Sequence, residues 1–343
     1  MDKIFDIANV SVRIVTQKNS GAIESLFTEF CETNNKPQLT IILQNDVGNF
    51  SKSPYFLVSR SKIQRESILY TDSLLTVGYR INRDDSGNVV YINTHDKTHF
   101  SLIQRVKLVR FFNRFYPEKD MYELMGVLYG VFHYLIQILL IKSGSSYIHA
   151  SCVEKNGKAL LLPAWGGSGI GKTSLMYQLV TIGGWRFLAD DLTIISHDGT
   201  IHTNPNPIAV YPYNLKGLPE IKKNFLALQS FIGRFQWYLF QGLFGEKGAT
   251  RRVSPVKLLG NSNIAKIGIL EEVVSLVRWD QPNFEIRQTT IDELATCATS
   301  TILAEIRQFR YEYNAWNSIP GCDLFPKSWE IAKSTNQIFT EAF

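Results

Sequence analysis

Residues 166–173 read Gly-Gly-Ser-Gly-Ile-Gly-Lys-Thr, a complete P-loop (Walker A) motif, and no other feature limits the fold as strongly. Its four glycines leave backbone N–H groups free to turn toward one anion at the start of a helix. In this pattern Lys172 reaches the β- and γ-phosphates of a nucleotide, and the Thr173 hydroxyl ligates Mg²⁺. The predicted nucleotide-binding residues are Gly166, Gly167, Ser168, Gly169, Ile170, Gly171, Lys172, Thr173 and Ser174.

The residues on both sides of the motif have the pattern that a P-loop requires. The apolar run 159–162 predicts a buried strand that enters the loop, and 174–180 predicts the helix that leaves it. This context favours a phosphate site over the alternative, a glycine-rich turn before an ordinary helix.

Two adjacent carboxylates follow the motif at short range. After a Gly-Gly stop, residues 185–189 predict an apolar strand that leads directly into Asp190 and Asp191. A Walker B acid normally ends such a strand, so strand, loop, helix and acidic strand form one compact unit. A solvated turn is the alternative for an isolated Asp-Asp pair, and the position directly after a P-loop helix argues against it.

Three short segments together resemble one known family. Residues 146–150 (Ser-Tyr-Ile-His-Ala), the P-loop and residues 187–191 (Phe-Leu-Ala-Asp-Asp) are similar to the catalytic domain of HPr kinase/phosphorylase, a bacterial protein-serine kinase. The resemblance is closer to HPr-kinase-related proteins encoded beside peptide-modifying enzymes, several of which phosphorylate a serine of a ribosomal peptide. It is specific over residues 146–196, diffuse to about 310, and does not cover the first hundred residues. It implies an α/β catalytic fold shared with phosphoenolpyruvate carboxykinase.

The resemblance also implies roles for single residues. By position, His149 approaches the transferred phosphate, Asp190 takes the proton of the serine hydroxyl, and Asp191 lies near the metal. The two aspartates can also exchange these roles. The chemistry agrees, because transfer to a hydroxyl needs a nearby base and an ionised carboxylate beside a divalent cation supplies one. For His149 a purely structural role stays open, and its position one hairpin before the P-loop favours the functional role (Asn156-Gly157 is a type I′ turn signal).

Two segments depart from the family pattern. The bifunctional family carries a glutamate beyond the Asp pair, whereas residues 204–215 contain no acid and the next carboxylate is Glu220. This leaves the third metal ligand and any phosphorylase activity unassigned. The basic loop 249–255 offers Arg251 or Arg252 in place of a family arginine near the phosphates, where it would stabilise charge on the transferred group. A solvated basic turn is the alternative.

The composition fits a folded cytoplasmic protein. The chain has 343 residues, of which 45% are hydrophobic and 20% charged, enough for two domains with cores. Its net charge of +5 is not gathered into one run, so we expect no nucleic-acid partner, whereas an anionic nucleotide or an acidic peptide suits it. The four cysteines have no paired spacing, which indicates neither zinc nor disulfides, and no signal peptide is evident. The oligomeric state is open, a homo-oligomer included.

We expect a small α/β domain at 1–99, a helical connector at 100–145 and the catalytic domain at 146–343. In the first domain the predicted helix is 22–31, and the predicted strands are 10–16, 38–43, 55–58, 67–70, 74–79 and 89–92. This domain carries no recognisable chemistry, so it is a candidate for recruiting the acceptor, with a structural cap as the alternative. His95 and His99 have a helical metal-ligand spacing but no third ligand nearby, so we predict no metal there.

The connector contains two predicted helices. Residues 101–116 are amphipathic with a basic face. Residues 124–141 are nearly all apolar, and their length approaches that of a membrane span. Because His133 and Gln137 interrupt this run, we predict a buried core helix and no membrane partner.

Beyond the Asp pair, residues 218–244 predict one long aromatic-rich helical stretch, with core packing as the first interpretation and a wall of the acceptor pocket as the alternative. Further strands are predicted at 264–270, 273–279 and 284–287. Thr290 and Glu293 form a capping box for a helix that we expect to reach 309.

The sequence thus predicts an ATP- and Mg²⁺-dependent kinase of the HPr-kinase-like type, with a serine of a peptide or small protein as acceptor. A free hydroxylated small molecule is the alternative acceptor. A non-transferring ATPase or nucleotide-binding module is the alternative class, and it would release phosphate without labelling a substrate. A membrane protein anchored by residues 124–141 is a third class, tested by solubility without detergent.

Overall fold

The computed structural model describes residues 2–16, 29–44, 56–58, 61–64, 67–71, 76–81, 88–93, 132–165, 169–204, 206–277, 285–306, 310–319 and 326–343. By their contacts these residues form two compact units. The first contains the described residues from 2 to 143 and from 306 to 332. The second contains those from 144 to 305 and from 333 to 343.

The first unit is built on a sheet of nine described strands in the order β3-β1-β2-β4-β9-β8-β7-β6-β5. The strands are β1 (Asp2–Ile7), β2 (Val10–Thr16), β3 (Cys31–Glu32), β4 (Leu39–Gln44), β5 (Phe56–Val58), β6 (Ser61–Gln64), β7 (Ser67–Thr71), β8 (Thr76–Ile81) and β9 (Asn88–Asn93). β2, β4 and β9 pair in parallel. The apolar side chains of β2, Val10, Val12 and Ile14, are buried, as the period-two pattern requires.

This sheet confirms the six strands that the sequence predicts in this region and adds β1, β3 and β6. Residues 22–28 of the predicted helix 22–31 lie outside the described residues. Its last residue, Cys31, belongs to β3, which pairs with β1, so the predicted helix end is wrong. His95, His99 and the predicted helix 101–116 also lie outside the described residues.

Two of the described helices pack on this sheet. α5 (His133–Lys142) contacts β2, and α11 (Arg310–Asn317) contacts β6 and β7. Residues 133–140 are buried, which confirms the core-helix interpretation for the described half of 124–141. No helix in the described ranges is both long and apolar enough to cross a membrane. The contacts of α11 group it with the amino-terminal strands, whereas the sequence analysis assigned residues 310–317 to the predicted catalytic domain.

The second unit contains a sheet of eight described strands in the order β10-β14-β15-β18-β12-β11-β13, with β19 beside β12. The strands are β10 (Ser145–Ile148), β11 (Ala150–Lys155), β12 (Lys158–Trp165), β13 (Arg186–Ala189), β14 (Thr193–Ser196), β15 (Thr200–His202), β18 (Ile267–Val273) and β19 (Leu276–Val277). β11 and β12 form a hairpin. Its turn residues Asn156 and Gly157 have φ of 56° and 82°, which confirms the predicted type I′ turn.

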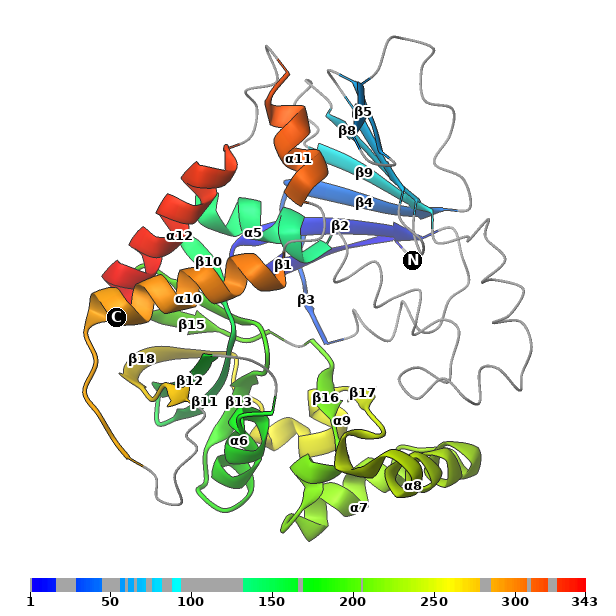
Figure 1. The fold of residues 1–343 in the computed structure, drawn as a ribbon, viewed down its shortest axis with the longest axis vertical. Helices are drawn as coiled ribbons and strands as arrows, with labels where there is room; N and C mark the ends of the chain where they lie inside the picture. The colour runs from blue at the N-terminus through cyan, green and yellow to red at the C-terminus, as the bar shows by residue number, and fades with distance from the viewer. Residues whose placement is uncertain are drawn as a thin grey trace. The chain divides into compact units, whose positions relative to one another are not determined.

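The described helices that belong wholly or partly to this unit include α6 (Lys172–Thr181), α10 (Ile291–Glu305) and α12 (Ser328–Ala342). α6 packs against β11 and β13, and α10 packs against β10 and β12 (Figure 1). α10 begins with the predicted capping box, in which the Glu293 N–H donates to the Thr290 hydroxyl at 3.2 Å. β18 and β19 confirm two of the strands predicted after the site. The strand predicted at 284–287 is wrong, because the described residues 285–287 are not in a strand. Arg287 Nε instead donates to Glu285 Oε1 at 2.7 Å, and both side chains are exposed to solvent.

A group of short elements lies between β15 and β18 in the chain. β16 (Ile208–Val210) and β17 (Arg251–Val253) pair antiparallel. The helical elements are η2 (Pro212–Leu215), α7 (Pro219–Ala227), α8 (Phe231–Phe244), η3 (Gly245–Lys247), α9 (Pro255–Leu259) and η4 (Asn261–Asn263). The predicted continuous stretch 218–244 is therefore two helices. Ser230 begins the second, because its hydroxyl accepts the Gly233 N–H at 3.1 Å.

The two helices pack against each other through aromatic side chains. Phe225 of α7 and Trp237 of α8 are buried, with ring centroids 4.6 Å apart. Phe231, Phe235 and Tyr238 are exposed, so the core-packing prediction is wrong for these three residues.

Candidate functional site

The described end of the P-loop turns directly into α6. Gly169 and Gly171 have φ of 89° and 114°, left-handed values that favour glycine at both positions. α6 begins at Lys172 with Gly171 as its N-cap, so the positive end of the helix dipole lies at the loop. Gly166, Gly167 and Ser168 lie outside the described residues.

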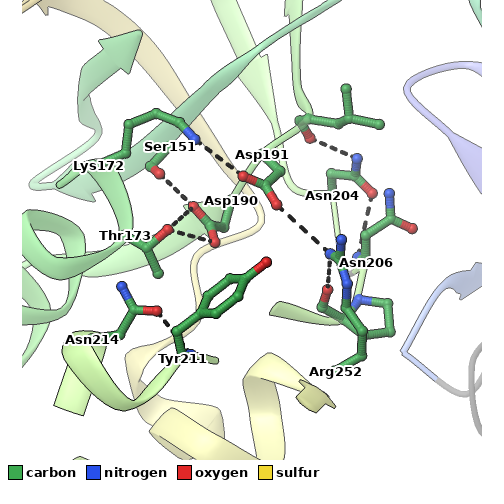
Figure 2. Close-up of polar contacts among 12 residues, drawn as sticks. Ser151, Lys172, Thr173, Asp190, Asp191, Asn204, Asn206, Tyr211, Asn214 and Arg252 are labelled. Carbon is green, nitrogen blue, oxygen red and sulfur yellow. Dashed lines mark hydrogen bonds and ion pairs between the residues drawn. The ribbon is translucent and has the colours of Figure 1, made fainter. Parts of the chain in front are cut away.

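Asp190 joins the P-loop helix to the sheet. It follows directly on β13, and only 6% of its surface is exposed. The Thr173 hydroxyl lies 3.1 Å from each of its carboxylate oxygens. On the neighbouring strand β11, the Ser151 hydroxyl donates to the same carboxylate. The hydroxyl predicted to ligate the metal therefore contacts Asp190, as Figure 2 shows.

Asp191 has different partners from Asp190. Its φ of 62° is left-handed, a conformation that aspartate tolerates better than most non-glycine residues. Lys172 Nζ lies 3.0 Å from Oδ1, and Arg252 Nη1 lies 3.7 Å from Oδ2. The Asp191 carboxylate thus lies between two cations (Figure 2).

These partners move the pKa values of the two aspartates in opposite directions. Burial and the charge of Asp191 raise the pKa of Asp190, against the influence of Lys172 and the two hydroxyls. Burial also raises the pKa of Asp191, but the charges of Lys172, Arg252 and His149 outweigh it and bring that pKa to about 2. Burial lowers the pKa of Lys172, and the two carboxylates more than reverse this. Asp191 is therefore firmly ionised at neutral pH and Lys172 is charged.

His149 lies between β10 and β11 and lines the same cavity as Lys172 and Asp191. Burial and the Lys172 charge lower its pKa, and the charges of Asp191 and Glu305 partly oppose this. A neutral imidazole at this position can donate one hydrogen bond and accept another.

The two arginines of the predicted basic loop have separate environments, because neighbouring residues of a strand point to opposite sides. Arg252 lines the cavity and donates to the Pro207 carbonyl at 3.1 Å. Arg251 is buried against α8, where it donates to the Gln236 side chain and lies over the Trp237 ring at 5.9 Å. The structure brings Arg252 to the cavity and leaves Arg251 outside its lining.

Asparagines occupy residues 204–215, the segment that contains no acid. Asn204 donates a hydrogen bond at 2.6 Å to the carbonyl of Leu192, the residue directly after the Asp pair. Asn214 accepts the Tyr211 N–H at 2.9 Å and donates to the Ser174 hydroxyl at 3.1 Å. These amides hold the segment against the P-loop helix and against the turn that carries Asp191. Ser174, predicted to bind nucleotide, contacts Asn214 in this way and does not line the cavity.

The cavity has a volume of about 220 Å³. Its lining residues are His149, Ala164, Gly169, Ile170, Gly171, Lys172, Thr173, Asp191, Ala209, Tyr211, Tyr213, Asn214, Arg252, Thr301 and Glu305. The sequence did not point to Thr301 and Glu305, which are four residues apart on α10 and face the cavity from more than a hundred residues beyond the P-loop. Glu220, the first acid after 204–215, lies on α7 and not in this lining.

The sequence also did not point to Lys247. A β-carbon placed on Gly169 would lie 3.5 Å from the Lys247 Nζ, so this ammonium lies beside the P-loop. Lys247 belongs to η3, directly after α8, and no motif distinguishes it from other surface lysines.

Within the described ranges, no group of three or more His, Cys, Asp or Glu side chains is placed to hold a metal ion. A comparison with protein-family models and another with curated proteins find no match to this chain. The interpretation of the site therefore depends on its own residues.

Proposed function

We propose that this chain is an ATP-dependent kinase that transfers the γ-phosphate to a serine hydroxyl of a peptide or small protein. The observation that carries the proposal is one connected set of contacts: Thr173 to Asp190, and Lys172 to Asp191 to Arg252. A P-loop lysine and hydroxyl, two adjacent carboxylates and an arginine are the groups that phosphoryl transfer uses for positioning and charge stabilisation. The HPr-kinase resemblance of the same residues supports this reaction class.

The residues at the loop fit a magnesium ion that arrives with a nucleotide. Mg²⁺ prefers oxygen ligands and is usually held by one or two carboxylates, phosphates and water. The Thr173 hydroxyl and the Asp190 carboxylate are 3.1 Å apart, so these two oxygen donors would hold it. When bound, the ion would neutralise charge on the phosphates. A larger protein ligand set is not required for this use of Mg²⁺.

The contacts favour exchanged roles for the two aspartates. Asp190 is buried and engaged by two hydroxyls, which suits a metal ligand. Asp191 lines the cavity and is ionised, which suits the group that receives the serine proton. In the proposed reaction Asp191 holds the acceptor hydroxyl and takes its proton as the serine oxygen bonds to the γ-phosphorus. The bond from the γ-phosphorus to the β,γ-bridging oxygen breaks and ADP leaves, while Lys172 and Arg252 stabilise the charge on the phosphoryl group.

His149 and Lys247 complete the polar surroundings of the phosphates in this proposal. His149, kept neutral, would hydrogen-bond to the transferred group without adding a charge. Lys247 would add a cation at the P-loop side of the cavity.

The alternative is an ATPase, in which water replaces the serine hydroxyl at Asp191. The two functions differ in the product that carries the γ-phosphate. γ-Labelled ATP and Mg²⁺ would be incubated with the peptides encoded by neighbouring genes, and the products identified by mass spectrometry. We expect a phosphoserine in one of these peptides; label found only in inorganic phosphate would contradict the kinase proposal.

A further inference from the structure

α10 brings a carboxylate to the cavity from outside the P-loop motif. All the lining residues of the cavity belong to the second unit, and two of them, Thr301 and Glu305, come from α10. α10 packs against β10 and β12, and His149, which follows β10 directly, lines the same cavity. This packing holds Glu305 in the cavity where the transferred phosphate is proposed to bind.

The Glu305 carboxylate has no contact that balances its charge. The other carboxylate of the lining, Asp191, lies between Lys172 and Arg252. Within the described ranges of the chain, the Glu305 carboxylate takes part in no hydrogen bond or ion pair, and its side chain is exposed. Burial and the Lys172 charge lower the pKa of His149, and Glu305 is one of the two carboxylates that oppose this. The Glu305 charge therefore acts on the cavity and is open to a cationic ligand.

The position of Glu305 in its helix adds to the negative potential. α10 has 15 residues and ends at Glu305, so this carboxylate lies at the negative end of the helix dipole. A cation is favourable at that end of a helix, whereas a carboxylate is unfavourable. Residues that break a local rule in this way are expected at functional sites. The P-loop has the opposite arrangement, because the positive end of α6 lies there and suits an anion.

The reaction itself limits what Glu305 can bind. Like charges repel, so this carboxylate opposes the binding of nucleotide phosphates. The proposed Mg²⁺ ligands are Thr173 and Asp190, which belong to α6 and to the turn after β13. This leaves a cation that the acceptor carries. Ammonium and guanidinium groups are the cations of a polypeptide, and both donate charge-assisted hydrogen bonds to a carboxylate.

We propose that Glu305, at the carboxyl end of α10, binds a cationic group of the acceptor close to the serine that is phosphorylated. This proposal depends on the proposed kinase function and narrows its substrate class. The cation is a lysine or arginine side chain, or the α-ammonium group of an N-terminal serine. The cavity has a volume of about 220 Å³, and an extended chain advances about 3.3 to 3.6 Å per residue. A side-chain cation is therefore expected within about three residues of the serine.

The test uses two libraries of random peptides, phosphorylated by the full-length protein with MgATP. In the first library the serine is internal and the N-terminus is acetylated; in the second the serine is the first residue and its α-ammonium group is free. Enrichment of lysine or arginine near the phosphorylated serine in the first library would identify a side-chain cation. Phosphorylation of the second library that acetylation abolishes would identify the α-ammonium group. Phosphorylation without a preference for a cation in either library would overturn the role of Glu305 and leave the kinase function standing.

Variants of the enzyme test the same contact from the other side. With one preferred peptide, Glu305→Gln should raise KM on the order of tenfold with kcat nearly unchanged, because the ion pair with the acceptor is lost. With the same peptide lacking its cation, Glu305→Gln should change KM by less than about twofold. Asp292→Asn is the matched control, because it removes an exposed carboxylate near the other end of α10, about 20 Å away, and should leave KM within about twofold.

Further measurements separate this role from two others. The affinity of Glu305→Gln for a fluorescent ATP analogue with Mg²⁺ reports correct folding and should match that of the wild type. A loss of Mg²⁺-dependent affinity would overturn the proposal and make Glu305 a metal ligand. An equal fall in kcat with the cationic and the neutral peptide would also overturn it and make Glu305 a positioning residue for His149. Failure of the wild type to phosphorylate any peptide would overturn the kinase function together with this proposal.

Discussion

Thr173→Val and Ser151→Ala form a matched pair of substitutions around one carboxylate. Both hydroxyls donate to Asp190, but only Thr173 lines the cavity and is proposed to ligate Mg²⁺. Both variants should therefore destabilise the protein, and only Thr173→Val should also weaken MgATP binding.

The expected loss of stability follows from the burial of Asp190. A hydrogen bond to a charged group contributes about 1.5 to 3 kcal/mol, and Asp190 is too buried for water to replace the lost donor. For a unit of this size, that loss lowers the melting temperature by about 3 to 12 °C. We expect a decrease in this range for each variant without nucleotide, measured by scanning calorimetry.

The rise in melting temperature that MgATP causes separates the two variants. ATP at about 100 times its Kd stabilises a protein by about 2.7 kcal/mol, which raises the melting temperature by about 5 to 11 °C. Wild type and Ser151→Ala should show this rise with MgATP. If Thr173→Val binds about 100-fold more weakly, the same ATP concentration stabilises it by only about 0.4 kcal/mol. Chelation of Mg²⁺ should remove the difference between the variants. An equal MgATP-dependent rise in Thr173→Val and Ser151→Ala would refute the assignment of the Thr173–Asp190 pair to the metal.

Five further substitutions test three cationic residues and the two aspartates. Lys172→Ala should lower turnover on the order of 100-fold or more in a steady-state assay, and near-normal turnover would contradict the P-loop assignment. Arg252→Ala should lower transfer on the order of 100-fold with little change in melting temperature, whereas Arg251→Ala should mainly lower the melting temperature because it loses buried contacts with α8. Asp191→Asn should retain MgATP binding in calorimetry and lose transfer, and asparagine tolerates the positive φ of this position. Asp190→Asn should instead lose Mg²⁺-dependent nucleotide binding. The reverse result would restore the roles that the family resemblance implies for the two aspartates.

The sequence predicted the strand–loop–helix–strand unit because its signals are local. The apolar run before the P-loop, the glycines and the strand before Asp190 each require a particular backbone within a few residues. The turn at Asn156-Gly157 and the capping box at Thr290 are signals of the same kind, and the structure contains both.

The features that the sequence did not predict depend on long-range contacts. Glu305 reaches the cavity only because α10 packs on β10 and β12. No motif in the neighbouring sequence distinguishes it as a residue of the site. The exposure of Phe231 and Phe235 could not be predicted, because an aromatic helix resembles a core helix whether one side or both sides are covered. The separation of Arg251 from Arg252 was predictable in principle, once residues 251–253 were recognised as a strand with alternating side-chain directions.

The most direct test of the central claim is the fate of the γ-phosphate in a single turnover. Wild-type protein would be mixed with γ-labelled ATP, Mg²⁺ and a peptide acceptor, and the label would be divided into phosphopeptide and inorganic phosphate. We predict that the label appears on one serine, that a peptide with Ala at that serine receives none, and that Asp191→Asn transfers none while still binding ATP. Release of the label as inorganic phosphate at the same rate with and without the peptide would contradict the proposed kinase function.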